Sequence, residues 1–230
     1  MVGFGGATGY LAAMSLFDIP PQVMASTALL LNIGVAGISF ASFFRAGHFS
    51  ITLAWPFLLT SIPAAFLGGY FKISDQTYMF FLYAVLTFVA FRLLFISTNP
   101  KKDDRIIPIP VHLGLLVGLV IGLISGMIGI GGGIFLCPLI IFAGWGTSKQ
   151  ASATAASFIV LNSISGLVGR LIGGSFVVDA MGVYLIPIGL ASAIAGSRFG
   201  AIGLSGTNLK RAVGVVMAVA VSTFWWSSWK

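Results

Sequence analysis

Long apolar runs alternate with short polar breaks along almost the whole chain. A helix that crosses a membrane needs about 20 mostly apolar residues, and runs near that length recur. They cover residues 2–17, 23–44, 51–71, 77–97, 111–130, 132–144, 150–172, 180–200 and 209–228. The breaks hold proline, glycine and charged residues, which is typical of loops. The pattern predicts an all-α polytopic membrane protein with about eight or nine membrane segments.

One polar stretch, residues 99–110, is longer than the other breaks and divides the chain almost in half. We interpret it as a linker between two transmembrane repeats, residues 1–98 and 111–230. Both halves show the same landmarks in the same order: a glycine cluster, a span rich in Ala, Ser and Thr with an Asn, and a basic turn that contains Gly. Several matches in one order indicate an internal repeat.

Composition agrees with a lipid environment. Of the 230 residues, 58% are hydrophobic and 7% are charged, whereas a soluble domain carries roughly 25% charged residues. An ordinary water-soluble enzyme is therefore excluded. The net charge of +7 is scattered in basic runs no longer than two residues, so nucleic acid is not an expected partner. One cysteine, two histidines and no Glu leave few ligands for a metal, and no cofactor is expected.

The basic residues predict which loops face the cytoplasm. They concentrate in the turns near 45–50 and 97–110 and, in the second half, near 145–149 and 201–211. The positive-inside rule places these turns in the cytoplasm. The turns near 18–22 and 71–76 lie on the other side, as does Arg170. The turn that follows the glycine cluster then faces outward in the first half and faces the cytoplasm in the second half, so the two repeats are inverted. This topology requires that residues 132–144 count as a short or steeply packed crossing.

The most specific feature is the motif Gly126-Met-Ile-Gly-Ile-Gly-Gly-Gly133. Gly114, Gly118 and Gly122 precede it at every fourth position, which predicts a smooth helix face for close packing in lipid. Three consecutive glycines are poor helix formers and should break the span into two half-helices. A helix that restarts inside the bilayer presents unpaired N–H groups and a positive dipole end, which suits an anion. A simple packing kink is the alternative, and the weaker copy Gly3-Phe-Gly-Gly6 argues against it.

Together these motifs resemble the sulfite exporter TauE/SafE family of membrane permeases, over essentially the whole chain. The resemblance implies transport of small sulfur-containing anions, such as sulfite, thiosulfate or organosulfonates, or of related organic anions. The first-half motif has Ala7 where the second has Gly133, and Ala12 where it has Pro138, so we expect the two half-sites to bind unequally. The resemblance rests on Gly126–Gly133 with Pro138, Lys149–Thr154 and Leu161–Gly166, echoed by Gly3–Gly6, Ile19–Gln22 and Ala25–Thr27.

The second half also has a lead-in helix, Val111 to Gly126, before its motif, whereas only Met1-Val2 precedes the first-half motif. We therefore expect the matching first lead-in helix to be missing from this sequence.

Hydroxyl and amide side chains follow each glycine cluster. An oxyanion needs several hydrogen-bond donors but no full positive charge, so we predict that glycine amides and these neutral side chains hold the substrate. Hydrogen bonding between helices is the structural alternative for the same side chains. The predicted substrate-binding residues are Gly5, Gly6, Ser26, Thr27, Asn32, Gly131, Gly132, Gly133, Thr154, Ser157 and Asn162.

Three other residues are predicted to have ordinary roles. Cys137 is expected to be a small buried filler. Arg45 and Arg170 are expected to be loop charges rather than ligands, although they could attract anions at a vestibule. All five acidic residues fall in or near predicted loops, so a carboxylate proton relay is disfavoured.

We therefore expect an alternating-access permease for a small anionic substrate in the cell (inner) membrane, multi-pass and surrounded by lipid. The protein could also form a homo-oligomer, which the sequence does not decide. Transport could be uniport, sodium-coupled or linked to a proton that the substrate carries. The alternative is an anion channel in which the same glycines line a pore. Catalysis is not expected, because no nucleophile–base or metal cluster is present.

Overall fold

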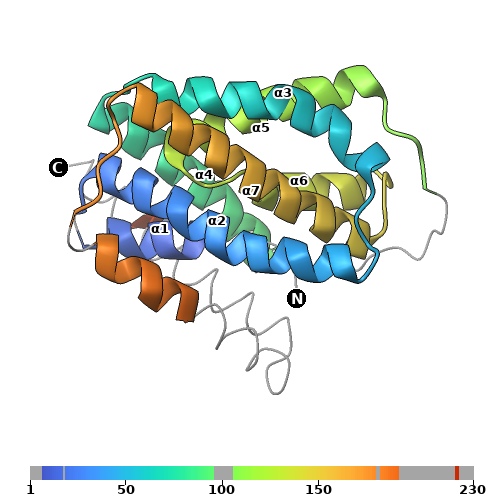
Figure 1. The fold of residues 1–230 in the computed structure, drawn as a ribbon, viewed down its shortest axis with the longest axis horizontal. Coiled ribbons are helices and arrows are strands. Elements are labelled where there is room, and N and C mark those ends of the chain that lie inside the picture. Colours follow the sequence, from blue (N-terminus) through green and yellow to red (C-terminus); the bar gives the residue numbers. More distant parts are fainter. Residues whose placement is uncertain (1–6, 18, 96–105, 180–181, 192–220, 223–230) are drawn as a thin grey trace.

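The computed structural model shows an all-helical bundle, in which every regular element of the described residues is an α-helix (Figure 1). The prediction of an all-α polytopic protein is confirmed. The description covers residues 7–17, 19–95, 106–179, 182–191 and 221–222. The helices are α1 (Ala7–Ser15), α2 (Pro21–Arg45), α3 (Ile51–Tyr70), α4 (Asp75–Phe95), α5 (Val111–Ile128), α6 (Gly133–Phe142) and α7 (Ser148–Ile172), followed by the helical segment Gly182–Ala191.

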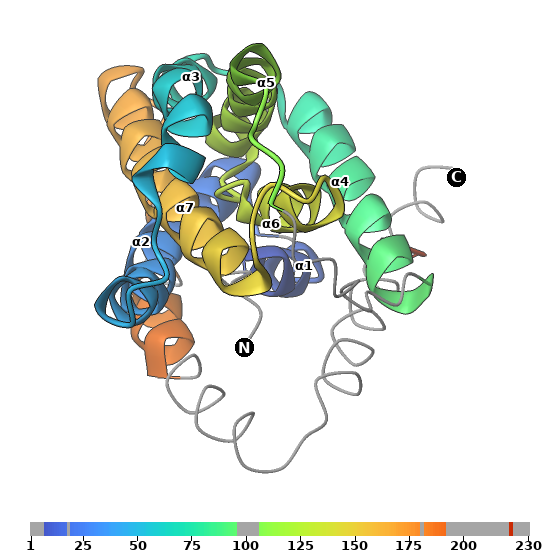
Figure 2. The ribbon, with the colours of Figure 1, turned by 90° about the vertical axis from the view of Figure 1, so that its right-hand side faces the viewer.

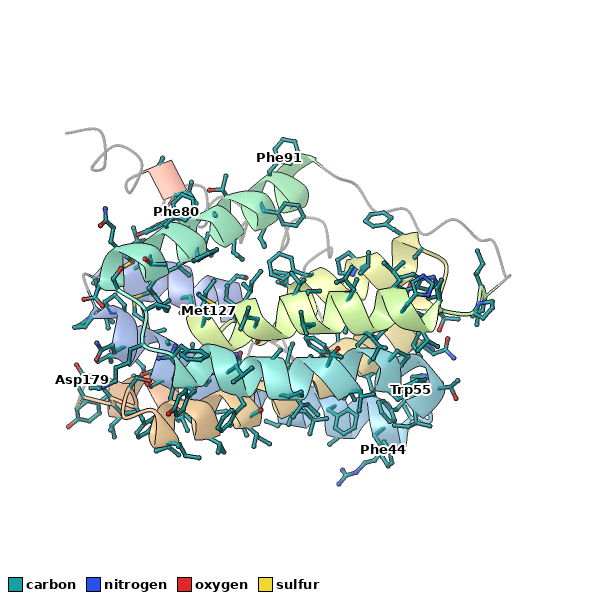
Figure 3. The ribbon with its side chains drawn as sticks, turned by 90° about the horizontal axis from the view of Figure 1, so that it is seen from above. Phe44, Trp55, Phe80, Phe91, Met127 and Asp179 are labelled. Atoms are coloured by element: carbon teal, nitrogen blue, oxygen red, sulfur yellow. The ribbon has the colours of Figure 1, made fainter. Side chains whose placement is uncertain are left out.

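Four of these helices, α2, α3, α5 and α7, are long and apolar enough to cross a membrane. Large apolar side chains also cover the outside of the bundle. Phe80, Phe88 and Phe91 on α4 are each more than half exposed, and Figure 3 shows Phe91 at the outer edge, pointing away from the other helices. A surface of this kind suits lipid rather than water. The last predicted run, 209–228, lies almost entirely outside the described residues.

The turns gather at two opposite ends of the bundle. At one, which we call the Lys72 end, Pro21, Lys72 and Ser175 line a common cleft. At the other, which we call the Arg45 end, the amide of Ile107 donates a hydrogen bond of 2.9 Å to the carbonyl of Gly144. Figure 3 places Asp179 and Trp55 at these opposite ends. The described turns group as the charge pattern predicts, whereas residues 97–105 and the turn near 201–211 lie outside the described residues.

Contacts between the helices show their directions. Residues from the start to the end of α5 meet residues in the same order on α3, and α3 meets α7 in the same order, so these three helices run in parallel toward the Lys72 end. α2 runs the opposite way. α1 and α6 begin inside the bundle and run to opposite ends, α1 to the Lys72 end and α6 to the Arg45 end. Figure 2 shows α6 enclosed by the other helices.

One expectation about the topology differs from the structure. We expected 132–144 to be a short crossing, but α6 has ten residues, which span about 15 Å. It starts beside Ile159, near the middle of α7, and returns to the end of the bundle from which α5 started. α5 and α6 thus form a hairpin whose tip lies within the bundle.

The predicted glycine stripe on α5 packs directly on α3. A Cβ at Gly114 would lie 2.7 Å from Cβ of Pro56, and one at Gly122 would lie 2.6 Å from Cα of Ser61. Next to the stripe, the Thr60 hydroxyl donates a hydrogen bond of 2.7 Å to the Leu115 carbonyl. Because lipid supplies no hydrophobic force between helices, such close backbone packing holds them together.

Alanine at Gly122 should therefore destabilise the protein. The added Cβ meets backbone atoms of Ser61, which cannot move aside without separating α3 from α5, so we expect a loss of about 1–3 kcal/mol. Thermal unfolding in detergent measures this. The control is Gly37→Ala on α2, where a Cβ meets nothing within 4 Å and Ala is the better helix former. Equal behaviour of the two variants would contradict the packing role of the stripe.

Candidate functional site

The break predicted from the glycine motif lies between α5 and α6. α5 ends at Ile128 and α6 begins at Gly133. Between them, Gly129, Gly131 and Gly132 have φ angles of 87°, 79° and 74°. L side chains rarely adopt this left-handed conformation, so the sequence of the motif is what allows the chain to turn here. The prediction of a glycine-broken helix is confirmed.

The glycines of the break lie deep in the bundle, at mid-length of the long helices. A Cβ at Gly131 would lie 2.7 Å from Cγ2 of Ile159, near the middle of α7, and 3.0 Å from Nδ2 of Asn32, near the middle of α2. Gly133 meets Ile159 as well. These predicted residues are therefore packed without space for a side chain. Gly5 and Gly6 lie outside the described residues.

The start of α6 offers backbone donors at this depth. Gly132 is the N-cap, with φ 74° and ψ −14°, and no side chain caps the helix. A left-handed residue followed by a helical one turns successive N–H groups toward one point, which forms a nest for an anion. The first N–H groups of a helix have no partner within it, and they carry the positive end of its dipole. The prediction that an anion binds at the three glycines rests on these backbone groups.

Side chains from three other helices, α2, α4 and α7, hold the end of α5. Each carbonyl from Gly126 to Gly129 accepts a hydrogen bond from one of them. On α7, Arg170 Nη2 donates to the carbonyls of Gly126 (3.4 Å) and Met127 (2.5 Å). On α4, the Tyr78 hydroxyl donates to the carbonyl of Ile128 at 3.0 Å.

The remaining support comes from α2 and α1. Asn32 Nδ2 donates to the carbonyl of Gly129 at 2.9 Å, and the Tyr10 hydroxyl donates to Asn32 Oδ1. The cationic guanidinium is favourable at this position, because the C-terminal end of a helix is negative. The break is thereby fixed to α1, α2, α4 and α7.

Arg170 is not the loop charge that we expected. α7 continues to Ile172, so Arg170 is still helical and turns inward, where it is only 6% exposed. Arg45, in contrast, is exposed at the end of α2, as predicted. Sequence reasoning also missed Tyr10 and Tyr78. The available signal for Arg170 was its spacing from Asn162 and Gly166, which puts all three on one helical face.

All six predicted side-chain donors are buried, but some are already paired within the protein. The Ser26 hydroxyl accepts a hydrogen bond of 3.3 Å from the amide of Val177. The Ser157 hydroxyl donates to the carbonyl of Thr154 at 2.8 Å. Asn32 is paired with the break itself. Asn32 and Ser26 thus bond to segments distant in sequence, close to the alternative of bonding between helices, whereas the Ser157 bond lies within α7 itself.

The other three predicted donors, Thr27, Thr154 and Asn162, have side-chain hydrogen-bonding groups without a partner. Within the described part of the chain, no partner is found for the hydroxyls of Thr27 and Thr154 or for either amide atom of Asn162. Cys137 is buried near Ser152, with 4.0 Å between Sγ and Oγ, which fits the predicted filler role.

Asn162 faces the break. Ile159, one turn before it, meets Gly131 and Gly133, and Gly166, one turn after it, lies against Gly126. Residues three and four apart share a helix face, so Asn162 lies between these two contacts. A buried polar group without a partner costs about 1–3 kcal/mol. An apolar residue would avoid that cost, so the side chain of Asn162 carries unused hydrogen-bonding groups next to the break.

Phenylalanine at Tyr78 should lower stability, because it leaves the buried carbonyl of Ile128 without its donor. We expect a loss of about 1–2 kcal/mol in the free energy of unfolding. Tyr184→Phe is the matched control, since Tyr184 is 70% exposed. Thermal unfolding of both variants in the same detergent checks this. If Tyr78→Phe unfolded together with the control, Tyr78 would have no supporting role at the end of α5.

Comparison with known proteins agrees with this architecture. A family model described as "Sulfite exporter TauE/SafE" matches residues 1–224. A relative from Sinorhizobium fredii (strain NBRC 101917 / NGR234), described as "Probable membrane transporter protein y4hK", is 33% identical, and the match covers 98% of this chain and 92% of the relative. No solved structure matches the chain.

Proposed function

Because the chain belongs to the sulfite exporter TauE/SafE family of membrane transporters, we propose that it is a permease that carries small sulfur-containing or organic anions by alternating access. The substrate class is that of sulfite, thiosulfate and sulfonates, and the location is the cell (inner) membrane. The observation that carries the proposal is Asn162, a fully buried amide without a protein partner at a glycine break.

The chemistry of the break suits an oxyanion. An anion that leaves water must exchange its hydration for donors inside the protein. The first N–H groups of α6 and the Asn162 amide provide neutral donors at one depth, and the Thr154 hydroxyl is a further free donor on α7. A charged side chain at this depth of a membrane would cost free energy. Neutral donors avoid that cost, and they can bind an anion and release it again.

Helix directions support alternating access. α1 runs opposite to α6, α2 runs opposite to α7, and α1 and α6 both begin inside the bundle. Transporters built from inverted repeats have this arrangement, with broken helices that meet near the midplane. We propose that Gly5 and Gly6 form the second half-site and that the Arg45 end faces the cytoplasm, since basic loops remain there. The two half-sites are unequal in this proposal, because Asn32 is already bound to the Gly129 carbonyl.

Flux of several anions into liposomes tests the proposal. Purified protein is reconstituted, and uptake of labelled sulfite, thiosulfate and methanesulfonate is measured with and without sodium and pH gradients. Saturable uptake of at least one of these anions is expected. Electrical recordings with far more ions per second than a carrier can cycle would instead identify a channel. No saturable flux of any small anion would overturn the proposal.

A further inference from the structure

A small cleft with charged and apolar side chains in its lining opens at the Lys72 end of the bundle, beside the carbonyls that end α5. Phe71, Lys72 and Asp75 at its rim are exposed, so the cleft reaches the surface. Its buried part contains Arg170 and Tyr78, which bind the carbonyls of Met127 and Ile128. The cleft thus leads from the surface toward the break. The charged residues of its lining are Lys72, Asp75 and Arg170.

Arg170 in this cleft has donor capacity that the support of α5 does not use. Only Nη2 donates to α5 carbonyls, and Nε is buried without a partner. In the described part of the chain, Arg170 forms no ion pair with a carboxylate. A guanidinium that is 6% exposed and unpaired by an acid is costly, and a bound anion would offset that cost.

The charges of the cleft define which anion fits. Lys72 and Arg170 are cationic, and Asp75 carries one negative charge, which leaves one net positive charge. A monoanion neutralises it. A dianion would add a negative charge beside Asp75. The planar fork of arginine matches the oxygens of a sulfonate or related oxyanion.

We propose that this cleft is a second anion site, through which substrate enters from the Lys72 end. It selects monoanions, such as alkanesulfonates and hydrogensulfite, over dianions, such as sulfate and thiosulfate, and so narrows the proposed substrate class to its monoanionic members. The inference rests on the proposed function and adds a separate site to it. Lys72 attracts the anion at the rim, Arg170 holds it in the buried part, and Asp75 disfavours a second negative charge.

Two rim variants test the proposal through the kinetics of methanesulfonate uptake, with sulfate as competitor. Lys72→Gln should raise the half-saturating methanesulfonate concentration roughly tenfold and leave the maximal rate unchanged. Asp75→Asn should let sulfate inhibit at concentrations roughly tenfold lower. Lys149→Gln is the control, because Lys149 is exposed at the Arg45 end and should change neither value. Wild-type kinetics in both rim variants would overturn the entry site and leave the permease intact.

A binding measurement separates this proposal from the proposed function. In an Asn162→Leu background, methanesulfonate should still raise the unfolding temperature in detergent, because the cleft remains. Adding Lys72→Gln should shift this response to roughly tenfold higher concentration. No response in the Asn162→Leu protein, or a response unaffected by Lys72→Gln, would overturn the cleft as an anion site whether or not wild-type protein transports.

Discussion

Alanine at Gly131 should strongly reduce transport while the protein still folds. The φ angle of 79° costs an L residue about 1–2 kcal/mol, and the new Cβ would press on Ile159 and on Asn32 Nδ2, at 2.7 and 3.0 Å. The backbone of the break must shift to relieve these contacts. The N–H groups at the start of α6 then no longer point together, and we expect the maximal uptake rate to fall at least about a hundredfold.

Gly47→Ala is the matched control for this result. Gly47 has a similar φ of 71°, but a Cβ there meets nothing within 4 Å, and it lies in the turn between α2 and α3. It should carry the same backbone strain and keep nearly wild-type uptake. Labelled-anion uptake per folded protein, with folding checked by size-exclusion chromatography, measures both variants. Equal uptake by Gly131→Ala and Gly47→Ala would mean that the geometry of the break does not matter for transport.

Leucine at Asn162 should remove transport without weakening the fold. The side chain of Asn162 is fully buried and bonds to no described residue, so an apolar side chain of similar volume loses no hydrogen bond and removes the cost of an unpaired amide. We expect an unfolding temperature equal to or above that of the wild type, together with a loss of uptake of at least about tenfold. A gain in stability with a loss of activity is typical of a ligand-binding residue.

Asn32→Leu is the contrasting variant. It removes the hydrogen bonds that Asn32 makes with the Gly129 carbonyl and with Tyr10, so it should destabilise the protein by about 1–3 kcal/mol. Thermal unfolding and uptake measured on the same preparations compare the two asparagines. If Asn162→Leu lost as much stability as Asn32→Leu, Asn162 would be a structural residue. If Asn162→Leu took up the anion at the wild-type rate, Asn162 would not belong to the binding site.

The helices and the break were predictable from the sequence for a physical reason. In lipid the backbone must satisfy its own hydrogen bonds, so each long apolar run becomes a helix. Gly129, Gly131 and Gly132 interrupt the pattern because only glycine readily adopts the left-handed turns found there. The stripe from Gly114 to Gly126 was predictable in the same way, since its spacing defines one helix face.

The partners of the polar groups were not predictable. Whether a hydroxyl on α2 or α7 is free depends on which carbonyl another helix brings to it. Ser26 meets Val177, which is distant in sequence, whereas Thr27 beside it meets no partner among the described residues. Arg170 looked like a loop charge because Gly173-Gly174 follows it closely. Its inward direction depends on where α7 ends and on how α5 packs against it.

Counterflow in proteoliposomes tests the central claim most directly, namely that the break binds an anion and presents it alternately to the two sides. Uptake of labelled sulfite by wild-type protein is compared between empty vesicles and vesicles loaded with unlabelled sulfite, with Gly131→Ala alongside. The account predicts saturable uptake that internal sulfite accelerates, and loss of both effects in Gly131→Ala. Uptake that does not exceed that of protein-free vesicles, or that is unchanged in Gly131→Ala, would contradict it.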